Sequence, residues 1–128
     1  MKWICQSTLP LHHTRSIYSV SWSKVHKNLI VSVGGDGCIK VIQVQDDHES
    51  GEGGNTVNDT TIHNNNNNNF KIIAQEEEAH GHSDINCVEW CPPPLMDARM
   101  SDADRDAMGL LFLTTGDDGV VKVWRLVL

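Results

Sequence analysis

The feature of this sequence that most restricts its fold is an internal repeat of short, strand-like segments. Residues 13–42 and 82–124 follow the same pattern, and the second copy contains fourteen additional residues. The first part matches at an offset of 68, through the pairs Ile17/Ile85, Val20/Val88 and Trp22/Trp90. The second part matches at an offset of 82, through the pairs Ser32/Thr114, Asp36/Asp118, Gly37/Gly119, Lys40/Lys122, Val41/Val123 and Ile42/Trp124. Such recurrence is typical of repeat proteins, in which each unit buries its apolar face against a neighbouring unit.

Each copy is predicted to form β-strands, because its apolar runs are short, rich in β-branched residues and separated by Gly-Asp turns. The predicted strands are 17–22, 29–33, 39–44 and 70–75 for the first copy, and 85–90, 110–115 and 120–126 for the second. Residues 1–9 are predicted to hold, at 3–9, the last strand of a preceding unit. The sequence therefore predicts an all-β fold with units at 13–75 and 80–128.

Two polar segments interrupt the units. Residues 45–69 include six consecutive asparagines and few apolar side chains, so they are predicted to be disordered. Residues 92–109 begin with three prolines and continue as a polar insertion. A short helix near 97–106 is compatible with this second insertion, but we do not predict one.

Charge, the length of the apolar runs and the number of cysteines exclude several classes of protein. The net charge is −7, and all of it lies in the two insertions, so no basic stripe remains to follow a nucleic-acid backbone. The apolar runs are too short to span a bilayer. Four scattered cysteines are too few for a disulfide scaffold, which favours a soluble protein in a reducing, intracellular compartment.

The order of polar residues in each copy resembles the WD-repeat unit of β-propellers. In the WD unit, a His precedes the first strand, a Ser or Thr lies in the second strand, an Asp-Gly turn follows, and a Trp ends the third strand. Each copy here has the His, the Ser or Thr and the Asp-Gly turn in the same order. The resemblance implies one four-stranded blade per unit and a buried hydrogen-bonded chain through these side chains. Its members here would be His13, Ser32 and Asp36 in the first unit, and Thr114, Asp118 and Trp124 with His82 or His80 in the second.

Two details of this predicted network differ between the units. The first unit has Ile42 in place of the Trp, so it is expected to lack the last donor and to be the less stabilising of the two. His13 lies four residues before Ile17, whereas His82 lies three and His80 five before Ile85. Both histidines therefore remain candidates.

Three segments are similar to the last two repeats of the WD-repeat scaffold family of cytosolic iron-sulfur cluster assembly: HTRSIYSVSWS, AHGHSDINCVEW and TTGDDGVVKVWRL. The resemblance implies a partial propeller, two blades of a seven-bladed parent, and hence a C-terminal portion of a longer protein. It implies partners that are subunits of an iron-sulfur targeting complex and apoprotein clients, no cofactor, and a location in the cytoplasm and also the nucleus. The alternative is a WD-repeat adaptor of a ubiquitin-ligase or RNA-processing complex.

Three polar residues of the first unit could indicate either catalysis or a structural role. Ser32, His13 and Asp36 are the residue types of a hydrolase triad. Because the second unit repeats them with a Thr and a Trp, we interpret them as a structural network and expect no enzyme. The cysteines are expected to be buried thiols rather than cluster ligands.

The predicted partner-binding surface is the mouth of the propeller. Arg15, Ser16 and Asp84 precede the innermost strands and should lie at this mouth, and Tyr18 is a further candidate. Both insertions should lie on the opposite face and leave the mouth open.

Overall fold

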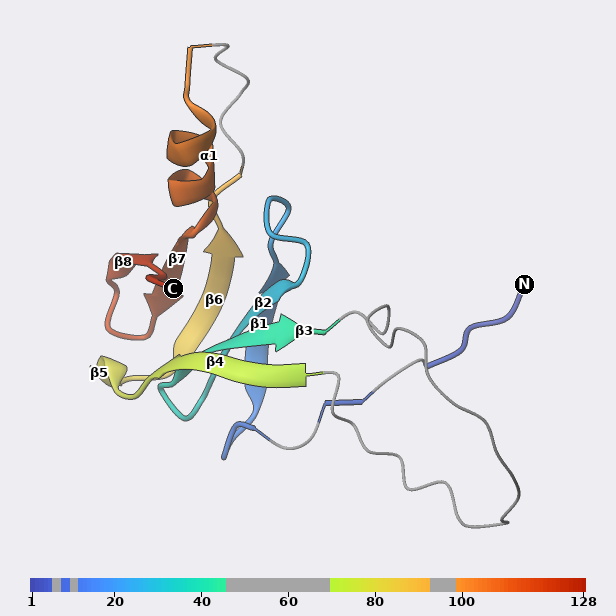
Figure 1. The fold of residues 1–128 in the computed structure, drawn as a ribbon. Coiled ribbons are helices and arrows are strands. Elements are labelled where there is room, and N and C mark those ends of the chain that lie inside the picture. Colours follow the sequence, from blue (N-terminus) through green and yellow to red (C-terminus); the bar gives the residue numbers. More distant parts are fainter. Residues whose placement is uncertain (6–7, 10–11, 46–69, 93–98) are drawn as a thin grey trace.

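The computed structural model describes residues 1–5, 8–9, 12–45, 70–92 and 99–128 (Figure 1). Its elements, in chain order, are β1 (Ile17–Trp22), β2 (Leu29–Gly34), β3 (Ile39–Val44), β4 (Phe70–Glu76), β5 (Ala79–His82), β6 (Ile85–Trp90), α1 (Asp102–Gly109), β7 (Leu111–Gly116) and β8 (Val121–Arg125). They form a four-stranded sheet in the order β1-β2-β3-β4 and a three-stranded sheet in the order β6-β7-β8. All strand pairs are antiparallel, so the predicted all-β fold is confirmed.

The two sheets repeat each other in register as well as in sequence. Ile17 faces Gly34 across β1 and β2, and its counterpart Ile85 faces Gly116 across β6 and β7. Both pairings are irregular at the same point, directly after this first residue. The sequence repeat is therefore a structural repeat, and we call the sheet β1–β4 the first unit and the sheet β6–β8 the second unit.

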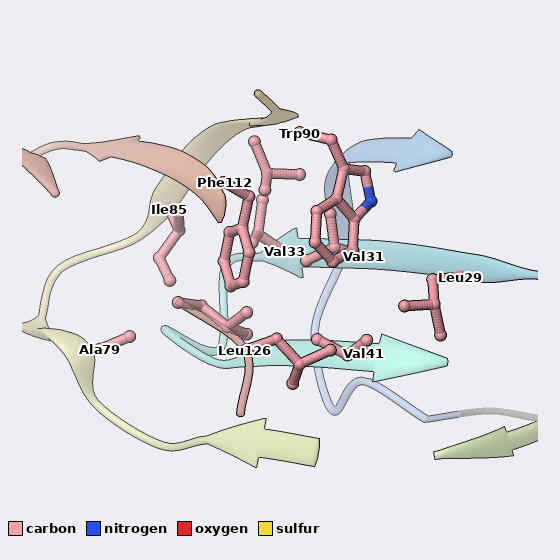
Figure 2. Packing of buried hydrophobic residues seen from close by; sticks show 11 residues of the cluster. Leu29, Val31, Val33, Val41, Ala79, Ile85, Trp90, Phe112 and Leu126 are labelled. Atoms are coloured by element: carbon pink, nitrogen blue, oxygen red, sulfur yellow. The ribbon is translucent and has the colours of Figure 1, made fainter. Parts of the chain in front are cut away.

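The core lies between the two units. Val31, Val33 and Val41 of the first sheet pack against residues of the second, among them Trp90 and Phe112 (Figure 2). The Trp90 and Phe112 rings meet edge to face, with centroids 5.1 Å apart. Each sheet thus buries one face against the other, as expected for units that cannot form a core alone.

Hydrogen bonds join the innermost strands β1 and β6. The backbone N–H of Trp90 donates to Ser21 Oγ at 3.2 Å, and the Trp90 indole N–H donates to the carbonyl of Ser21 at 3.1 Å. The N–H of Val88 donates to Ser19 Oγ at 3.2 Å. These bonds fix how the second unit sits on the first.

The tight turn that precedes the third strand of each unit depends on glycine. Gly37 and Gly119 have φ values of +70° and +71°, in the left-handed region that favours glycine. In both turns the glycine N–H donates to a carbonyl three residues earlier, that of Gly34 or of Gly116. The Asp-Gly sequence therefore produces the same turn twice.

Several elements differ from the sequence predictions. The described residues of the segment 1–9 form no strand, and Trp3 and Ile4 are exposed. The last strand of a unit pairs with the third strand of that unit. In the first sheet this position beside β3 is occupied by β4. Apart from Gln45, the predicted disorder of residues 45–69 concerns residues that lie outside those described.

The second insertion contains the helix α1, which we did not predict. Ser101 caps its N-terminus by accepting the N–H of Asp104 at 3.2 Å, and Asp102 and Asp104 lie in the first turn, where carboxylates favour helix formation. The helix continues beyond the end of β6 that is remote from β5 (Figure 1). It therefore lies at the end of the sheets opposite the predicted mouth.

Candidate functional site

A network of polar side chains, centred on the buried His80 and Thr114, lies in the second unit. His80 Nδ1 lies 2.8 and 2.9 Å from the two carboxylate oxygens of Asp118, and His80 Nε2 lies 2.7 Å from Thr114 Oγ1. The Trp124 indole N–H donates to the same Thr114 oxygen at 2.8 Å. Asp118 also accepts the N–H of Val120, which ties the network to the turn before β8.

The geometry fixes the direction of each hydrogen bond. A carboxylate can only accept, so His80 Nδ1 carries the proton that it donates to Asp118. With this proton on Nδ1, the ring accepts at Nε2, and the Thr114 hydroxyl donates to it. Thr114 still has a free lone pair, which accepts from Trp124, so each of these polar atoms has a partner.

The first unit contains the same arrangement. His13 Nδ1 lies 2.9 Å from both oxygens of Asp36, and His13 Nε2 lies 2.9 Å from Ser32 Oγ. Asp36 also accepts the backbone N–H of Thr14 and of Cys38, each at 3.1 Å. The structure therefore brings together His13, Ser32 and Asp36.

The first unit has a third donor that the sequence analysis missed. His12 Nε2 lies 3.1 Å from Ser32 Oγ, at the oxygen whose hydroxyl proton points to His13. Because the Ser32 hydroxyl donates to His13, its oxygen accepts from His12, so His12 Nε2 is a donor and has the same role as the Trp124 indole. The expectation that the first unit lacks the last donor is therefore wrong, because the donor comes from the residue before His13 and not from the third strand.

Of the two candidate histidines of the second unit, the structure brings His80, and not His82, to Thr114 and Asp118. His82 is exposed, and its Nδ1 lies 3.6 Å from the Glu78 carboxylate at the surface. The additional residue between His80 and the strand is absorbed by a turn at Gly81, whose φ is +63° and in which Ser83 N–H donates to the His80 carbonyl. This turn lets a histidine five residues before Ile85 reach the same site as His13.

Both carboxylates are held in their ionised form. Burial raises the pKa of Asp36, but the hydrogen bonds from His13, Cys38 and Thr14 outweigh it, and the pKa lies below the usual value. The hydrogen bond from His80, helped by the N–H of Val120, lowers the pKa of Asp118. Each Asp therefore stabilises the fold in its charged state.

The network has the residue types of a triad but not the access. Ser32 and Thr114 are almost fully buried, and each hydroxyl is saturated by its neighbours. In the described part of the chain, every buried side-chain nitrogen and oxygen has a partner. A substrate cannot reach these oxygens, so the arrangement serves structure.

The remaining candidate ligands are dispersed. No three His, Cys, Asp or Glu side chains of the described residues converge on a site that could hold a metal ion. Cys5 and Cys87 are exposed, and Cys38 and Cys91 are half-buried, so the expectation of four buried thiols is wrong. The described helix is not long and apolar enough to cross a membrane.

The predicted partner-binding residues gather at the mouth end, where β1 and β6 begin. The Tyr18 hydroxyl donates to Asp84 Oδ2 at 3.1 Å, and this hydrogen bond raises the pKa of Tyr18. Arg15 donates to the carbonyl of Gly35 at 3.0 Å, and its guanidinium lies 3.7 Å from Asp84 Oδ1. Ser16 contributes its carbonyl, which accepts the N–H of Gly35 at 2.9 Å.

This group, which we call the mouth cluster (Arg15, Tyr18, Asp84), links the two units and remains accessible. The Arg15 side chain is 66% exposed, so its charge faces solvent. Asn86, which donates to Asp117 Oδ1 at 2.6 Å, extends the polar surface on the second unit. Sequence reasoning missed this pair, although Asn86 is the repeat counterpart of Tyr18 and could have been found from the offset of 68.

Comparison with known proteins agrees with this geometry. The family model of the WD domain, G-beta repeat, matches residues 3–43 and 75–125. The chain is 35% identical, over 98% of its length, to the probable cytosolic iron-sulfur protein assembly protein 1 of Chaetomium globosum, and 34% identical over 95% to the protein of the same name from Sclerotinia sclerotiorum. It spans 26% and 23% of these relatives, about a quarter of their length.

Proposed function

Because this chain belongs to the WD domain, G-beta repeat family, we propose that it forms part of a non-catalytic scaffold that binds protein subunits during cytosolic iron-sulfur protein assembly. The observation that carries the proposal is the similarity to proteins named for that assembly, which extends over nearly the whole chain.

The buried networks support a scaffold rather than an enzyme. Their polar atoms are used to hold the turns of each unit in place, as described above. A rigid frame that presents loop residues at one end is suited to binding proteins, because loops on a fixed scaffold carry recognition in many folds.

The mouth cluster is the surface that we assign to partner binding. The Tyr18–Asp84 hydrogen bond and the contact of Arg15 with Asp84 connect the two units, so the cluster has a defined shape before a partner binds. The exposed guanidinium of Arg15 suits a carboxylate of the partner. The helix α1 lies at the other end of the sheets and leaves this surface open (Figure 1).

The proposed partners are subunits of an iron-sulfur targeting complex and apoprotein clients, and the proposed location is the cytoplasm, with the nucleus as a second compartment. In this role the chain holds proteins together and does not carry the cluster. We therefore expect it to purify without iron.

The test is a pull-down of the tagged chain from an extract of its own cells, followed by mass spectrometry of the retained proteins. Arg15→Glu reverses the exposed charge of the mouth cluster. Arg125→Glu is the matched control, because Arg125 is also exposed but lies at the far end of β8. Both variants should show the circular dichroism of the parent chain.

The expected result is recovery of proteins that assemble or receive iron-sulfur clusters, with about tenfold or more weaker capture by Arg15→Glu and unchanged capture by Arg125→Glu. Recovery of a ubiquitin-ligase or RNA-processing complex without such proteins would contradict the proposed pathway. Equal capture by both variants would remove the mouth cluster from the proposal.

A further inference from the structure

Two positions that correspond in the repeat are used differently at the mouth of the two units. In the second unit, Asn86 donates to Asp117 Oδ1 at 2.6 Å, so the two side chains pair within that unit. Their counterparts in the first unit are Tyr18 and Gly35. Gly35 has no side chain to accept a hydrogen bond, and the Tyr18 hydroxyl donates instead to Asp84 Oδ2, at 3.1 Å. Because Asp84 directly precedes β6, the first unit uses this position to contact its neighbour.

The missing side chain at Gly35 makes room for this contact. A Cβ atom on Gly35 would lie 3.1 Å from the Tyr18 hydroxyl oxygen and 3.4 Å from Asp84 Oδ2. It would also lie 3.4 Å from Cε2 of the Tyr18 ring, so the ring passes directly over the glycine. The first of these distances is shorter than an ordinary van der Waals contact. Any larger residue at position 35 would therefore push the Tyr18 hydroxyl away from Asp84.

Both units fix the position of the Asp84 carboxylate. The backbone carbonyl of Asp84 accepts the N–H of Asp117 at 3.1 Å, which ties the residue to the turn before β8. Oδ2 of the carboxylate accepts from Tyr18, and Oδ1 lies 3.7 Å from Arg15 Nη1. The Asp84 side chain is 25% exposed and the Arg15 side chain is 66% exposed. A mostly covered, fixed negative charge thus lies beside a guanidinium that faces solvent.

Arg15 is held at one end only. In the described part of the chain, both polar contacts of its side chain are made by Nη1, which donates to the Gly35 carbonyl at 3.0 Å and faces Asp84. A guanidinium carries five N–H donors in a planar fork, so the edge formed by Nε and Nη2 is left for another acceptor. Such an edge matches the two oxygens of a carboxylate.

We propose that Tyr18, Asp84 and Gly35 position the guanidinium of the mouth cluster at the boundary between the two units, so that its Nε–Nη2 edge binds a carboxylate of a partner protein. Asp84 supplies the fixed charge, and Tyr18 holds that charge in place. Gly35 supplies the space for the Tyr18 ring and a carbonyl for Arg15. The inference rests on the proposed function, which assigns partner binding to this cluster.

Holding Arg15 in advance favours binding, because a long side chain loses rotamer freedom when a partner immobilises it. Part of that loss has already occurred before the partner arrives. Asp84 would oppose binding if it used the donors that the partner needs. It lies 3.7 Å from Nη1, beyond hydrogen-bond distance, and Tyr18 donates to its other oxygen. Asp84 therefore orients the guanidinium without occupying the Nε–Nη2 edge.

The first measurement is the ionisation of Tyr18, which ultraviolet absorbance follows directly because the chain has a single tyrosine. The hydrogen bond to Asp84 raises the pKa of Tyr18, since the hydroxyl must lose its proton beside a carboxylate, so the titration should lie above the ordinary value of about 10. Asp84→Asn and Gly35→Ala should each bring it back toward that value. Asp117→Asn is the matched control, because the Asp117 carboxylate accepts from Asn86, and it should shift the titration less.

The second measurement is the pull-down described above, with a double-mutant cycle on the tagged chain. Tyr18→Phe removes one hydroxyl and keeps the ring, and it should weaken capture of the retained proteins about three- to tenfold. In an Arg15→Gln background the same change should have no effect, because no guanidinium is left to position. A Tyr18 hydroxyl that touched the partner itself would instead add its loss to that of Arg15→Gln. Circular dichroism checks that each variant keeps the fold of the parent chain.

Three results would overturn the inference. Equal titration of Tyr18 in the parent chain and in Asp84→Asn would show that the hydrogen bond is not formed in solution. Additive losses for Tyr18→Phe and Arg15→Gln would show that neither residue positions the other. Stronger capture by Asp84→Asn would show that Asp84 competes with the partner for Arg15. Retained proteins from outside iron-sulfur assembly would contradict the proposed pathway alone, because the cycle is measured on whichever proteins the parent chain retains.

Discussion

Replacing Thr114 by Val probes the buried network of the second unit without changing the shape of the core. The side chains have nearly the same volume, so no cavity opens. The substitution removes the oxygen that lies 2.7 Å from His80 Nε2 and 2.8 Å from Trp124 Nε1. Its effect on the free energy of unfolding therefore comes from the two groups that lose their partner.

The expected magnitude follows from the burial of those groups. The His80 side chain is fully buried, so an unpaired Nε2 costs about 1–3 kcal/mol. Trp124 is only half-buried, so water can reach part of its ring and the loss is about 0.5–1.5 kcal/mol. Thr114→Val should thus lower the free energy of unfolding by about 1.5–4.5 kcal/mol.

The first unit provides the comparison. Ser32→Ala leaves the buried His13 and the half-buried His12 without their shared oxygen. Because His12 acts as the third donor, the loss should agree with that of Thr114→Val to within about 1 kcal/mol. Urea unfolding at one fixed protein concentration, followed by circular dichroism, gives both values.

A double-mutant cycle isolates the role of His12. If His12 donates to Ser32, the effects of His12→Phe and Ser32→Ala should couple by about 0.5 kcal/mol or more. Strictly additive effects, together with a Ser32→Ala loss far below that of Thr114→Val, would refute the assignment of His12 as the donor that replaces the Trp.

Two further predictions concern acid and the turns. Because the folded-state pKa of Asp36 and of Asp118 lies below the unfolded value of about 3.9, the stability they contribute is complete above that pH and is lost as the pH falls through the folded value. Urea midpoints should drop below about pH 4, less steeply for Asp36→Asn, and an identical acid profile for that variant would contradict this. Gly34→Ala should prevent folding, because its Cβ would lie 2.2 Å from the carbonyl oxygen of Ser16, whereas Gly119→Ala meets no atom within 4 Å and should cost only about 1–2 kcal/mol for its positive φ. Similar thermal midpoints for the two alanine variants would contradict the close approach at Gly34.

Much of the fold could be predicted from the sequence, because alternation and Gly-Asp turns are local signals. The predicted strand 39–44 coincides with β3, and the predicted strands 17–22 and 85–90 coincide with β1 and β6. The segment 3–9 has the same local signal, but its described residues form no strand. A strand requires a partner as well as a pattern, and that partner is not a local property.

The network was predictable in kind but not in detail. The repeat identified the residue types, yet spacing could not separate His80 from His82, since the answer depends on a left-handed residue at Gly81. His12 was missed because a hydrogen-bond donor can reach the same point from another segment. Whether one residue can take the place of another as a donor depends on three-dimensional proximity, which a repeat alignment does not contain.

The proposed role of this chain in a scaffold for cytosolic iron-sulfur protein assembly can be tested in the cell. The protein is depleted, and incorporation of radioactive iron is measured in cytosolic, nuclear and mitochondrial iron-sulfur enzymes. If the proposed role is correct, cytosolic and nuclear enzymes lose their clusters while mitochondrial enzymes keep theirs. Unchanged incorporation in the cytosolic and nuclear enzymes would contradict it.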